Sequence, residues 1–213
     1  MTRIFELNQH MVPRSTFVVA IAGTSGAGKS TLIESLVARL ENANALSLDD
    51  YRSSSIYPPV GEWLEAGADP NQFETPQFSA DAVALKEGRS IVHPVTQKVV
   101  EPGPYLILEE HFGRARSAMR DLIDFLVYVE TPLEIAHARK ILRKGEFLPW
   151  EDNPNLFIEN LREHLLWYIK FGRDFYIAAK RSACKDYDLI VDGTLPTEQI
   201  ADKVIEAVNK KYS

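Results

Sequence analysis

The chain has 213 residues, of which 45% are hydrophobic and 25% are charged, fractions that are typical of a globular protein. They exclude collagen-like, low-complexity and disordered chains. The formal net charge of −6 argues against a surface that coats nucleic acid, because such a surface needs excess positive charge to displace counterions from phosphates.

The cysteine content and the apolar segments indicate the compartment. A single cysteine, Cys184, cannot form an internal disulfide, so an oxidising environment is not required. The longest apolar run, at 17–22, is far shorter than the roughly 20 residues that span a bilayer. Residues 1–16 lack the apolar run and the cleavage site of a secretory signal. We therefore expect a cytoplasmic protein that binds neither a membrane nor a nucleic acid.

Short apolar runs alternate with longer helical patterns along the chain. The predicted strands cover 17–22, 45–48, 105–108, 125–129 and 187–191. The predicted helices cover 29–40, 79–87, 114–122, 132–143, 154–180 and 197–210. A break of the 154–180 helix near Gly172 is left open. Because most strands lack polar alternation, helices should cover both faces of the sheet. The pattern predicts an α/β fold with a five-stranded, mostly parallel sheet.

Two segments interrupt this alternation. Residues 51–104 form a long insert with many prolines, in which residues 90–100 predict a small hairpin. Residues 144–155 form a polar connection that contains proline and is expected to be mobile. The chain contains no internal repeat, so we expect one domain over 1–213 that carries this insert.

Residues 23–31 read Gly-Thr-Ser-Gly-Ala-Gly-Lys-Ser-Thr and fit the phosphate-loop pattern. The loop lies directly between a predicted strand and a predicted helix, which is the setting of that motif. Glycines let backbone N–H groups approach phosphate oxygens, and the helix N-terminus adds the positive end of its dipole. Lys29 would add a charge near the β- and γ-phosphates, and Ser30 would offer a hydroxyl ligand to Mg²⁺. The predicted nucleotide-binding residues are Gly23, Thr24, Ser25, Gly26, Ala27, Gly28, Lys29, Ser30 and Thr31.

Carboxylates follow two of the predicted strands. Asp49 and Asp50 end the 45–48 strand, and ligands of parallel sheets bind at that carboxyl edge. A kinase needs a carboxylate there to orient or deprotonate the acceptor hydroxyl, and Asp49 is the candidate. Capping of the next turn is the alternative, and it suits Asp50 better. Glu109 directly follows the 105–108 strand. This position resembles that of the Walker B acid, which holds Mg²⁺ directly or through water. A solvated glutamate at the end of the strand is the alternative.

These segments together resemble the uridine kinase and phosphoribulokinase family of P-loop small-molecule kinases, most closely its uridine kinase-like branch. The resemblance is carried by residues 23–31, by Ser-Leu-Asp-Asp-Tyr at 47–51, by Leu-Lys-Glu-Gly at 85–88 before Pro94, and by Leu-Ile-Leu-Glu at 106–109. It implies a P-loop NTPase fold, ATP as phosphoryl donor, and Mg²⁺ near Ser30, Asp49 and Glu109. It also implies that Asp49 acts as the catalytic base or orients the acceptor.

The resemblance implies further site residues. Glu74, within Phe-Glu-Thr-Pro at 73–76, would contact a sugar hydroxyl of the acceptor, unless it is merely solvated. Arg139 and Arg143 lie four apart on one helical face, a spacing similar to that at the lid of related nucleotide kinases. Arg139 would then stack on adenine, and Arg143 would meet the transferring phosphate. Solvated arginines are the alternative. The lid would cover about 139–160, and the insert at about 51–104 would lie on the acceptor side.

The identity of the acceptor stays open at this stage. True uridine kinases have a tyrosine–aspartate pair and a histidine after the hairpin proline, whereas this chain has Val-Thr-Gln-Lys at 95–98. Arg52 replaces a usual aromatic residue and would suit an anionic acceptor, although a surface arginine explains it equally well. His93 and His111 are weaker candidates for acceptor contact.

We therefore expect an ATP-dependent kinase that phosphorylates a hydroxyl of a small metabolite, either a nucleoside or another sugar-like compound. One alternative is a nucleotide-dependent switch or ATPase that hydrolyses its triphosphate without an acceptor. A second is a nucleoside monophosphate kinase, whose acceptor charge would be met by arginines, namely Arg52, Arg114, Arg116 and Arg173. Association into a homo-oligomer is also left open.

Overall fold

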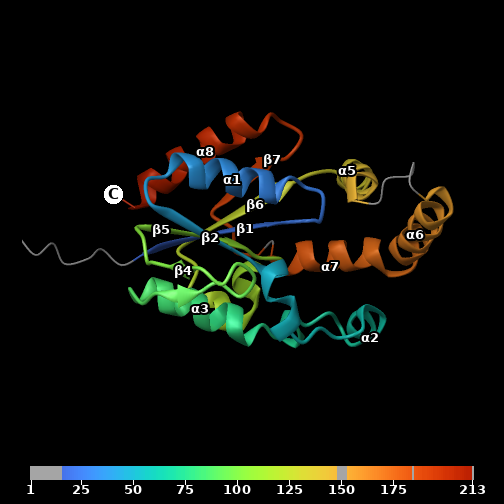
Figure 1. Ribbon diagram of the computed structural model, residues 1–213, viewed down its shortest axis with the longest axis horizontal. Helices are drawn as coiled ribbons and strands as arrows, with labels where there is room; N and C mark the ends of the chain where they lie inside the picture. Colours follow the sequence, from blue (N-terminus) through green and yellow to red (C-terminus); the bar gives the residue numbers. More distant parts are fainter. Residues whose placement is uncertain (1–15, 148–152, 184, 213) are drawn as a thin grey trace, which may run out of the picture.

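The computed structural model describes residues 16–147, 153–183 and 185–212. A parallel sheet of five strands in the order β2-β5-β1-β6-β7 forms its centre, as Figure 1 shows. Its strands are β1 (Phe17–Gly23), β2 (Ala43–Ser47), β5 (Tyr105–Glu109), β6 (Phe125–Glu130) and β7 (Leu189–Asp192). The predicted five-stranded parallel sheet is confirmed. Its second and last strands begin two residues earlier and two residues later, respectively, than the sequence predicts.

Helices cover both faces of this sheet, as the apolar strands predict. Helices α1 (Lys29–Arg39) and α8 (Thr197–Tyr212) lie on one face, and α3 (Pro76–Lys86) lies on the other (Figure 1). Along β1, Val18 and Ala20 contribute to the core under α3, whereas Val19 and Ile21 contribute to the core under α1 and α8. Successive side chains of a strand point to opposite faces, so a strand buried on both sides must be apolar throughout.

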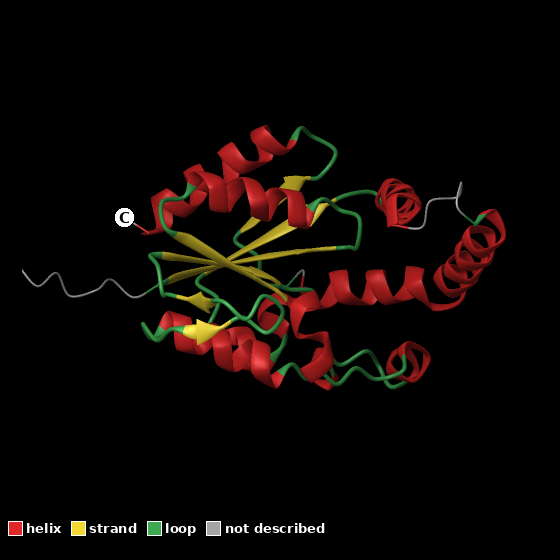
Figure 2. Cartoon of the chain, viewed as in Figure 1, coloured by secondary structure: helices red, strands yellow, loops and turns green. Residues whose placement is uncertain are grey.

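The insert after β2 is more ordered than its many prolines indicate. It consists of η1 (Leu48–Ser54), α2 (Val60–Glu65), η2 (Pro70–Gln72), α3, β3 (Ile91–Val92) and β4 (Val99–Val100). The last two pair antiparallel, which confirms the predicted hairpin, and Figure 2 shows it as a small ribbon apart from the central sheet. Trp63 of α2 is fully buried and packs with Phe73, Phe112 and Ala179. This apolar cluster fastens the insert to the main body.

The structure decides whether the long helix in the second half of the chain is broken, a point that the sequence left open. The predicted 154–180 helix is broken near Gly172: α6 (Pro154–Trp167) leads through a π-helical turn, η4 (Tyr168–Gly172), into α7 (Arg173–Ala183). Helices α6 and α7 run in different directions (Figure 1). A Cβ atom on Gly172 would lie 2.5 Å from the Trp167 ring, so the turn needs glycine. A π turn of this kind redirects a helix.

The helix predicted over 114–122 is not continuous. The structure has a short turn, η3 (Gly113–Ala115), followed by α4 (Ser117–Arg120). Arg116 separates the two because its backbone is extended, with φ −79° and ψ 126°. Its buried side chain is held by Glu110 at 2.5 Å, and this tertiary contact overrides the local helical pattern.

The connection around residue 150 is shorter than predicted. Helix α5 (Leu133–Phe147) extends beyond the predicted helix end at 143, and α6 begins at Pro154 after Asn153. The Asn153 side chain caps α6 by accepting a hydrogen bond from the Leu156 amide at 3.1 Å. The centre of the predicted lid, 148–152, lies outside the described residues. Within the described ranges, every helix is too short or too polar to cross a bilayer.

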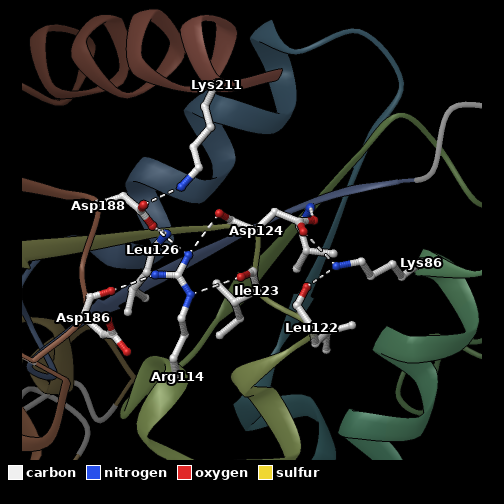
Figure 3. Close-up of polar contacts among 10 residues, drawn as sticks. Lys86, Arg114, Leu122, Ile123, Asp124, Leu126, Asp186, Asp188 and Lys211 are labelled. Carbon is white, nitrogen blue, oxygen red and sulfur yellow. Dashed lines mark hydrogen bonds and ion pairs between the residues drawn. The ribbon is translucent and has the colours of Figure 1, made fainter. Parts of the chain in front are cut away.

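Arg114 joins the starts of β6 and β7, as Figure 3 shows. Its guanidinium donates hydrogen bonds to the carbonyls of Ile123 (3.1 Å), Asp124 (3.0 Å) and Asp186 (2.7 Å). It also donates to the Asp188 carboxylate at 2.7 Å. Burial alone would raise the pKa of Asp188, but hydrogen bonds from Lys211, Leu126 and Arg114 lower it below its usual value. Arg114 is therefore a structural residue. It is not available to bind the phosphate of an acceptor, as the nucleoside monophosphate kinase alternative requires.

We expect Arg114→Ala to lower the free energy of unfolding by about 2–3 kcal/mol, because it leaves several backbone carbonyls without their donor. Urea denaturation measures the change. Arg120→Ala is the matched control, since Arg120 lies exposed on α4, and its effect should stay within about 0.5 kcal/mol. Equal effects of the two substitutions would contradict the assigned role.

Candidate active site

The phosphate loop is shaped by two glycines between β1 and α1. Gly26 and Gly28 have positive φ angles of 87° and 102°, a region that residues with a side chain rarely adopt. Gly28 is the N-cap of α1 and has no side chain with which to cap it. The first amides of α1 therefore stay available to an anion at the positive end of the helix dipole. A Cβ on Gly26 would lie 2.0 Å from the Ala136 carbonyl oxygen, so the loop packs directly against α5.

A cleft of about 410 Å³ opens beside this loop. It brings together residues from the loop, from the ends of β2 and β5, from the insert, and from α5 and α7. They are Ser25, Gly26, Gly28, Lys29, Ser30, Thr31, Asp49, Arg52, Tyr57, Phe73, Glu109, His111, Lys140, Arg143, Phe175 and Tyr176. The cleft therefore lies at the carboxyl edge of the parallel sheet, where ligands of such sheets bind.

Three predicted loop residues support the loop rather than line the cleft. The Thr24 carbonyl accepts a hydrogen bond from the Lys29 ammonium at 3.2 Å, and the Ala27 carbonyl accepts one from the Thr131 hydroxyl at 3.1 Å. Gly23 approaches the Val129 carbonyl so closely that a Cβ would lie 2.8 Å from it. These contacts hold the backbone in the shape that the cleft requires.

Lys29 and Glu109 form a buried ion pair at the centre of the site. The Lys29 ammonium lies 3.3 Å from one Glu109 oxygen, and the Ser47 hydroxyl donates to the other at 2.9 Å. Burial lowers the pKa of Lys29, while the Glu109 carboxylate opposes that shift. Burial would raise the pKa of Glu109, but Lys29, Ser47 and His111 together hold it below its usual value. The carboxylate is thus ionised at neutral pH and holds the lysine beside the phosphate loop.

Asp49 faces the cleft from the start of η1. In the sheet, β5 lies between β1 and β2, and Glu109 is in register with Ile21 of β1 and Ser47 of β2. Glu109 therefore lies between the phosphate loop and Asp49. Within the described residues the exposed Asp49 side chain makes no hydrogen bond or ion pair, whereas its neighbour Asp50 lies 3.5 Å from His93 and outside the cleft lining. Asp49 is thus free to contact a ligand.

The adjacent acid, Glu110, has a structural role. It is fully buried, accepts a hydrogen bond from the Phe112 amide at 3.0 Å, and pairs with Arg116 at 2.5 Å. Arg116 in turn donates to the Phe73 carbonyl at 3.0 Å and to the Thr75 hydroxyl at 2.7 Å. This chain of contacts fixes the insert to the end of β5. Arg116 is therefore unavailable to an acceptor.

Helix α5 contributes Lys140 and Arg143 to the cleft. The sequence pairs Arg139 with Arg143, but the structure turns Arg139 to the Gly193 carbonyl, to which it donates at 2.8 Å. Lys140, which the sequence analysis missed, donates to the Tyr176 hydroxyl at 3.2 Å. Burial and the charge of Arg143 lower the pKa of Lys140. Lys140 and Arg143 lie three apart on the helix, and that spacing also places residues on one face, so the signal for Lys140 was present.

The acceptor-side residues from the insert divide into two groups. Arg52 lines the cleft, together with Tyr57 and Phe73, which the sequence did not single out as contact residues. Glu74 is exposed, is absent from the cleft lining, and contributes its backbone to a bridge with Ile56. The structure therefore brings Phe73 rather than Glu74 to the site.

His111 follows the buried acids and also lines the cleft. Burial, followed by the charge of Lys29, lowers its pKa to about 4. Its imidazole is therefore neutral at neutral pH, and it offers a ligand one donor and one acceptor without adding charge.

The oxygen-bearing side chains of the cleft fit Mg²⁺. Ser30, Asp49 and Glu109 offer one hydroxyl and two carboxylates, which are hard oxygen ligands. The described part of the chain contains no cluster of three or more acidic, histidine or cysteine side chains that could hold a metal alone. Magnesium is commonly held by one or two carboxylates together with substrate phosphates, so this donor set is sufficient when a nucleotide is bound.

Two histidines stack between α5 and α6. The rings of His137 and His164 are nearly parallel, with centroids 5.2 Å apart, and His137 also stacks on Tyr168 at 3.6 Å. Both nitrogens of His137 and Nε2 of His164 are buried without a hydrogen-bond partner among the described residues. Burial, followed by the charge of Lys140, lowers both pKa values, that of His164 to about 4. Both rings are therefore neutral at neutral pH.

Acid should destabilise this contact. An imidazole whose pKa is lower in the folded state takes up its proton first in the unfolded state, so stability is lost as the pH falls from about 6.5 towards 4. Each such histidine contributes a slope of up to about 1.4 kcal/mol per pH unit. We expect His164→Phe to lose less free energy of unfolding between pH 7 and pH 5 than the wild type, as measured by urea denaturation. His111 titrates in both proteins, so its contribution cancels in the comparison. Equal losses of unfolding free energy in the wild type and in His164→Phe would contradict the prediction.

The arrangement of strand, glycine-rich loop and helix at the edge of a parallel sheet defines a P-loop NTPase fold. No family model matches the chain. It is 30% identical over 141 residues to the uridine kinase of Leuconostoc citreum (strain KM20), covering 59% of this chain and 67% of that protein. The chain belongs to the uridine kinase family.

The chain is also similar to a second curated relative and to a solved structure. The uridine kinase of Halobacterium salinarum (strain ATCC 700922 / JCM 11081 / NRC-1) is 30% identical over 140 residues, 60% of this chain. The chain spans only 62% of the length of that relative. A solved structure described as a possible uridine kinase from Bacillus stearothermophilus is 18% identical, with a TM-score of 0.54 over 84% of this chain and 90% of that one. This likeness supports the fold.

Proposed function

We propose that this protein is an ATP-dependent kinase that transfers the γ-phosphoryl group to a hydroxyl of a small metabolite. The observation that carries the proposal is the placement of Asp49, a carboxylate without a hydrogen bond or ion pair in the described part of the chain, in one cleft with Lys29 and Ser30 of the phosphate loop. A phosphoryl donor and an acceptor hydroxyl can meet between these groups. The uridine kinase names of the relatives support the same reaction class.

In the proposed reaction, Asp49 orients the acceptor hydroxyl and accepts its proton. The acceptor oxygen forms a bond to the γ-phosphorus, while the bond from that phosphorus to the oxygen bridging it to the β-phosphate breaks, and ADP leaves. Lys29 and Arg143 supply positive charge for the phosphoryl oxygens in the transition state. Mg²⁺, when bound, neutralises charge on the phosphates, and Ser30, Asp49 and Glu109 are the residues that would hold it.

The structure weighs against the nucleoside monophosphate kinase alternative. Arg114 and Arg116 are engaged in structural contacts, and Arg173 lies outside the cleft lining, 3.6 Å from Asp174. Of the four arginines proposed for that acceptor, the cleft contains Arg52.

The aromatic wall of Tyr57, Phe73 and Phe175 favours a bound acceptor over a switch that hydrolyses ATP alone. A single cysteine fits a reducing compartment, which supports the cytoplasm as the place of action.

Incubation with ATP, Mg²⁺ and a panel of hydroxylated metabolites tests the proposal. The panel includes uridine and cytidine, because the relatives are named uridine kinases. We expect ADP release that depends on the acceptor, and one acceptor that gains a single phosphate by mass spectrometry. ADP release at the same rate without any acceptor would support the ATPase alternative, and absence of ADP throughout would refute the kinase.

A further inference from the structure

Arg52 is held beside the proposed base by the geometry of η1. In a 3₁₀ helix, residues three apart lie above one another. Leu48 and Tyr51 are buried, and Tyr51 packs edge-on against Phe78 with ring centroids 5.3 Å apart. The other face presents Asp49 and Arg52, three residues apart, and both line the cleft. The buried face thus fixes the direction of the cleft-facing one.

The charge of Arg52 has no partner among the residues that the structure describes. Its side chain makes no hydrogen bond or ion pair to any residue that the structure describes, although the chain as a whole is acidic, with a net charge of −6. The other arginines considered for the acceptor, such as Arg114 and Arg116, are tied to carboxylates. An unpaired guanidinium in a ligand cleft is a ready site for an anionic oxygen group, because its planar fork can bind two oxygens at once.

Other cationic side chains of the cleft are placed to bind the triphosphate. Lys29 belongs to the phosphate loop, and Arg143 is close enough for its charge to lower the pKa of Lys29. Lys140 lies on the same helix as Arg143 and responds to that charge as well. Arg52 instead comes from the insert, beyond Asp49, together with Tyr57 and Phe73. The charge of Arg52 is therefore not needed to bind the phosphates of the nucleotide.

An aromatic wall lies on the same side. The ring centroids of Tyr57 and Phe73 are 5.5 Å apart, and those of Phe73 and Phe175 are 5.9 Å apart. Such a wall packs against the carbon face of a sugar or a ring, while the hydroxyl is held by Asp49. Arg52 is the cation that would meet a charged substituent of the same molecule.

We propose that the acceptor is an anion, a hydroxylated compound whose carboxylate or phosphate group is bound by Arg52. The inference rests on the proposed kinase function, since it specifies the substrate class of the same site. It separates this protein from the relatives described above, which are named uridine kinases after uridine, a neutral nucleoside.

Paired acceptors test the inference by kinetics. Glycerate and gluconate are compared with their amides, and ribose 5-phosphate and glucose 6-phosphate with ribose and glucose. We expect kcat/KM to be at least about tenfold higher for the anionic member of a productive pair. Arg52→Gln should raise the KM for that member about 30-fold and leave its kcat and the KM for ATP within about threefold. Arg52→Lys should restore part of the loss, because it keeps the charge but not the fork.

Binding measurements separate the two proposals. The same compounds are titrated by calorimetry into the wild type, Arg52→Gln and the matched control Arg120→Gln, each saturated with Mg²⁺ and a non-hydrolysable ATP analogue. We expect anionic compounds to bind the wild type and the control but not Arg52→Gln. Such binding without phosphoryl transfer would refute the kinase and support the anion site. Three results would overturn the inference. The first is phosphoryl transfer to neutral compounds with equal or higher kcat/KM. The others are anion binding that Arg52→Gln does not weaken, and the absence of anion binding in all three proteins.

Discussion

Replacing Asp49 by asparagine is expected to lower kcat about 10³-fold while the protein stays folded, because a positioned general base contributes roughly 10²–10⁴-fold to such reactions. Asparagine keeps the size of the side chain and removes its ability to accept a proton. Asp49 is exposed and makes no hydrogen bond within the described residues, so the fold does not depend on it. Initial rates of ADP formation at saturating ATP, Mg²⁺ and acceptor measure kcat.

Asp50→Asn is the matched control for this substitution. Asp50 is the adjacent aspartate, faces His93 at 3.5 Å and does not line the cleft, so its loss should change kcat less than about threefold. A thermal melt of both variants checks that the fold is intact. If Asp49→Asn and Asp50→Asn have the same activity, the base is another group and the proposed mechanism is wrong.

Gly26→Ala is expected to damage both the fold and the site. The new Cβ would lie 2.0 Å from the Ala136 carbonyl oxygen, and φ at this position is 87°. Backbone strain and overpacking together should lower the free energy of unfolding by about 3–4 kcal/mol. Displacement of α5 would also move Lys140 and Arg143, and a shift of about 1 Å can reduce kcat/KM about 10²-fold. Urea denaturation and ADP formation measure the two effects.

Gly88→Ala separates the two causes. Gly88 has a similar φ of 79°, but its Cβ would meet nothing within 4 Å. It should therefore show the strain alone, about 1–2 kcal/mol, and normal activity. Equal losses of stability in both variants would mean that the close packing of the phosphate loop against α5 contributes nothing.

The contacts of α5 explain why sequence reasoning chose Arg139 where the structure offers Lys140. Both residues lie within one turn of Arg143, so helical spacing alone cannot distinguish them. The choice depends on what surrounds the helix: the Gly193 carbonyl takes Arg139 on one side, and the Tyr176 hydroxyl takes Lys140 on the other. Both partners come from segments more than thirty residues further along the chain. A local pattern does not contain that information.

The error at 114–122 has the same origin. Its composition favours a helix, yet Arg116 leaves the helical conformation to reach Glu110, Phe73 and Thr75. A buried guanidinium must find partners, because an unpaired buried charge is strongly unfavourable. Tertiary contacts of this strength outweigh helix propensities, which amount to less than about 1 kcal/mol per residue.

The central sheet and the phosphate loop could be predicted from the sequence alone. Both are local features, because each is encoded by consecutive residues. The strands are apolar runs that are buried on both faces, and the loop is a motif of nine adjacent residues. Which side chains meet across the cleft could not be predicted, because it depends on how distant segments pack together. Asp49 and Arg52 come from η1, Glu109 from the end of β5 and Lys140 from α5, so their meeting depends on strand order and on the packing of the insert and of α5. These depend on contacts between residues far apart in the chain, which no spacing within one segment encodes.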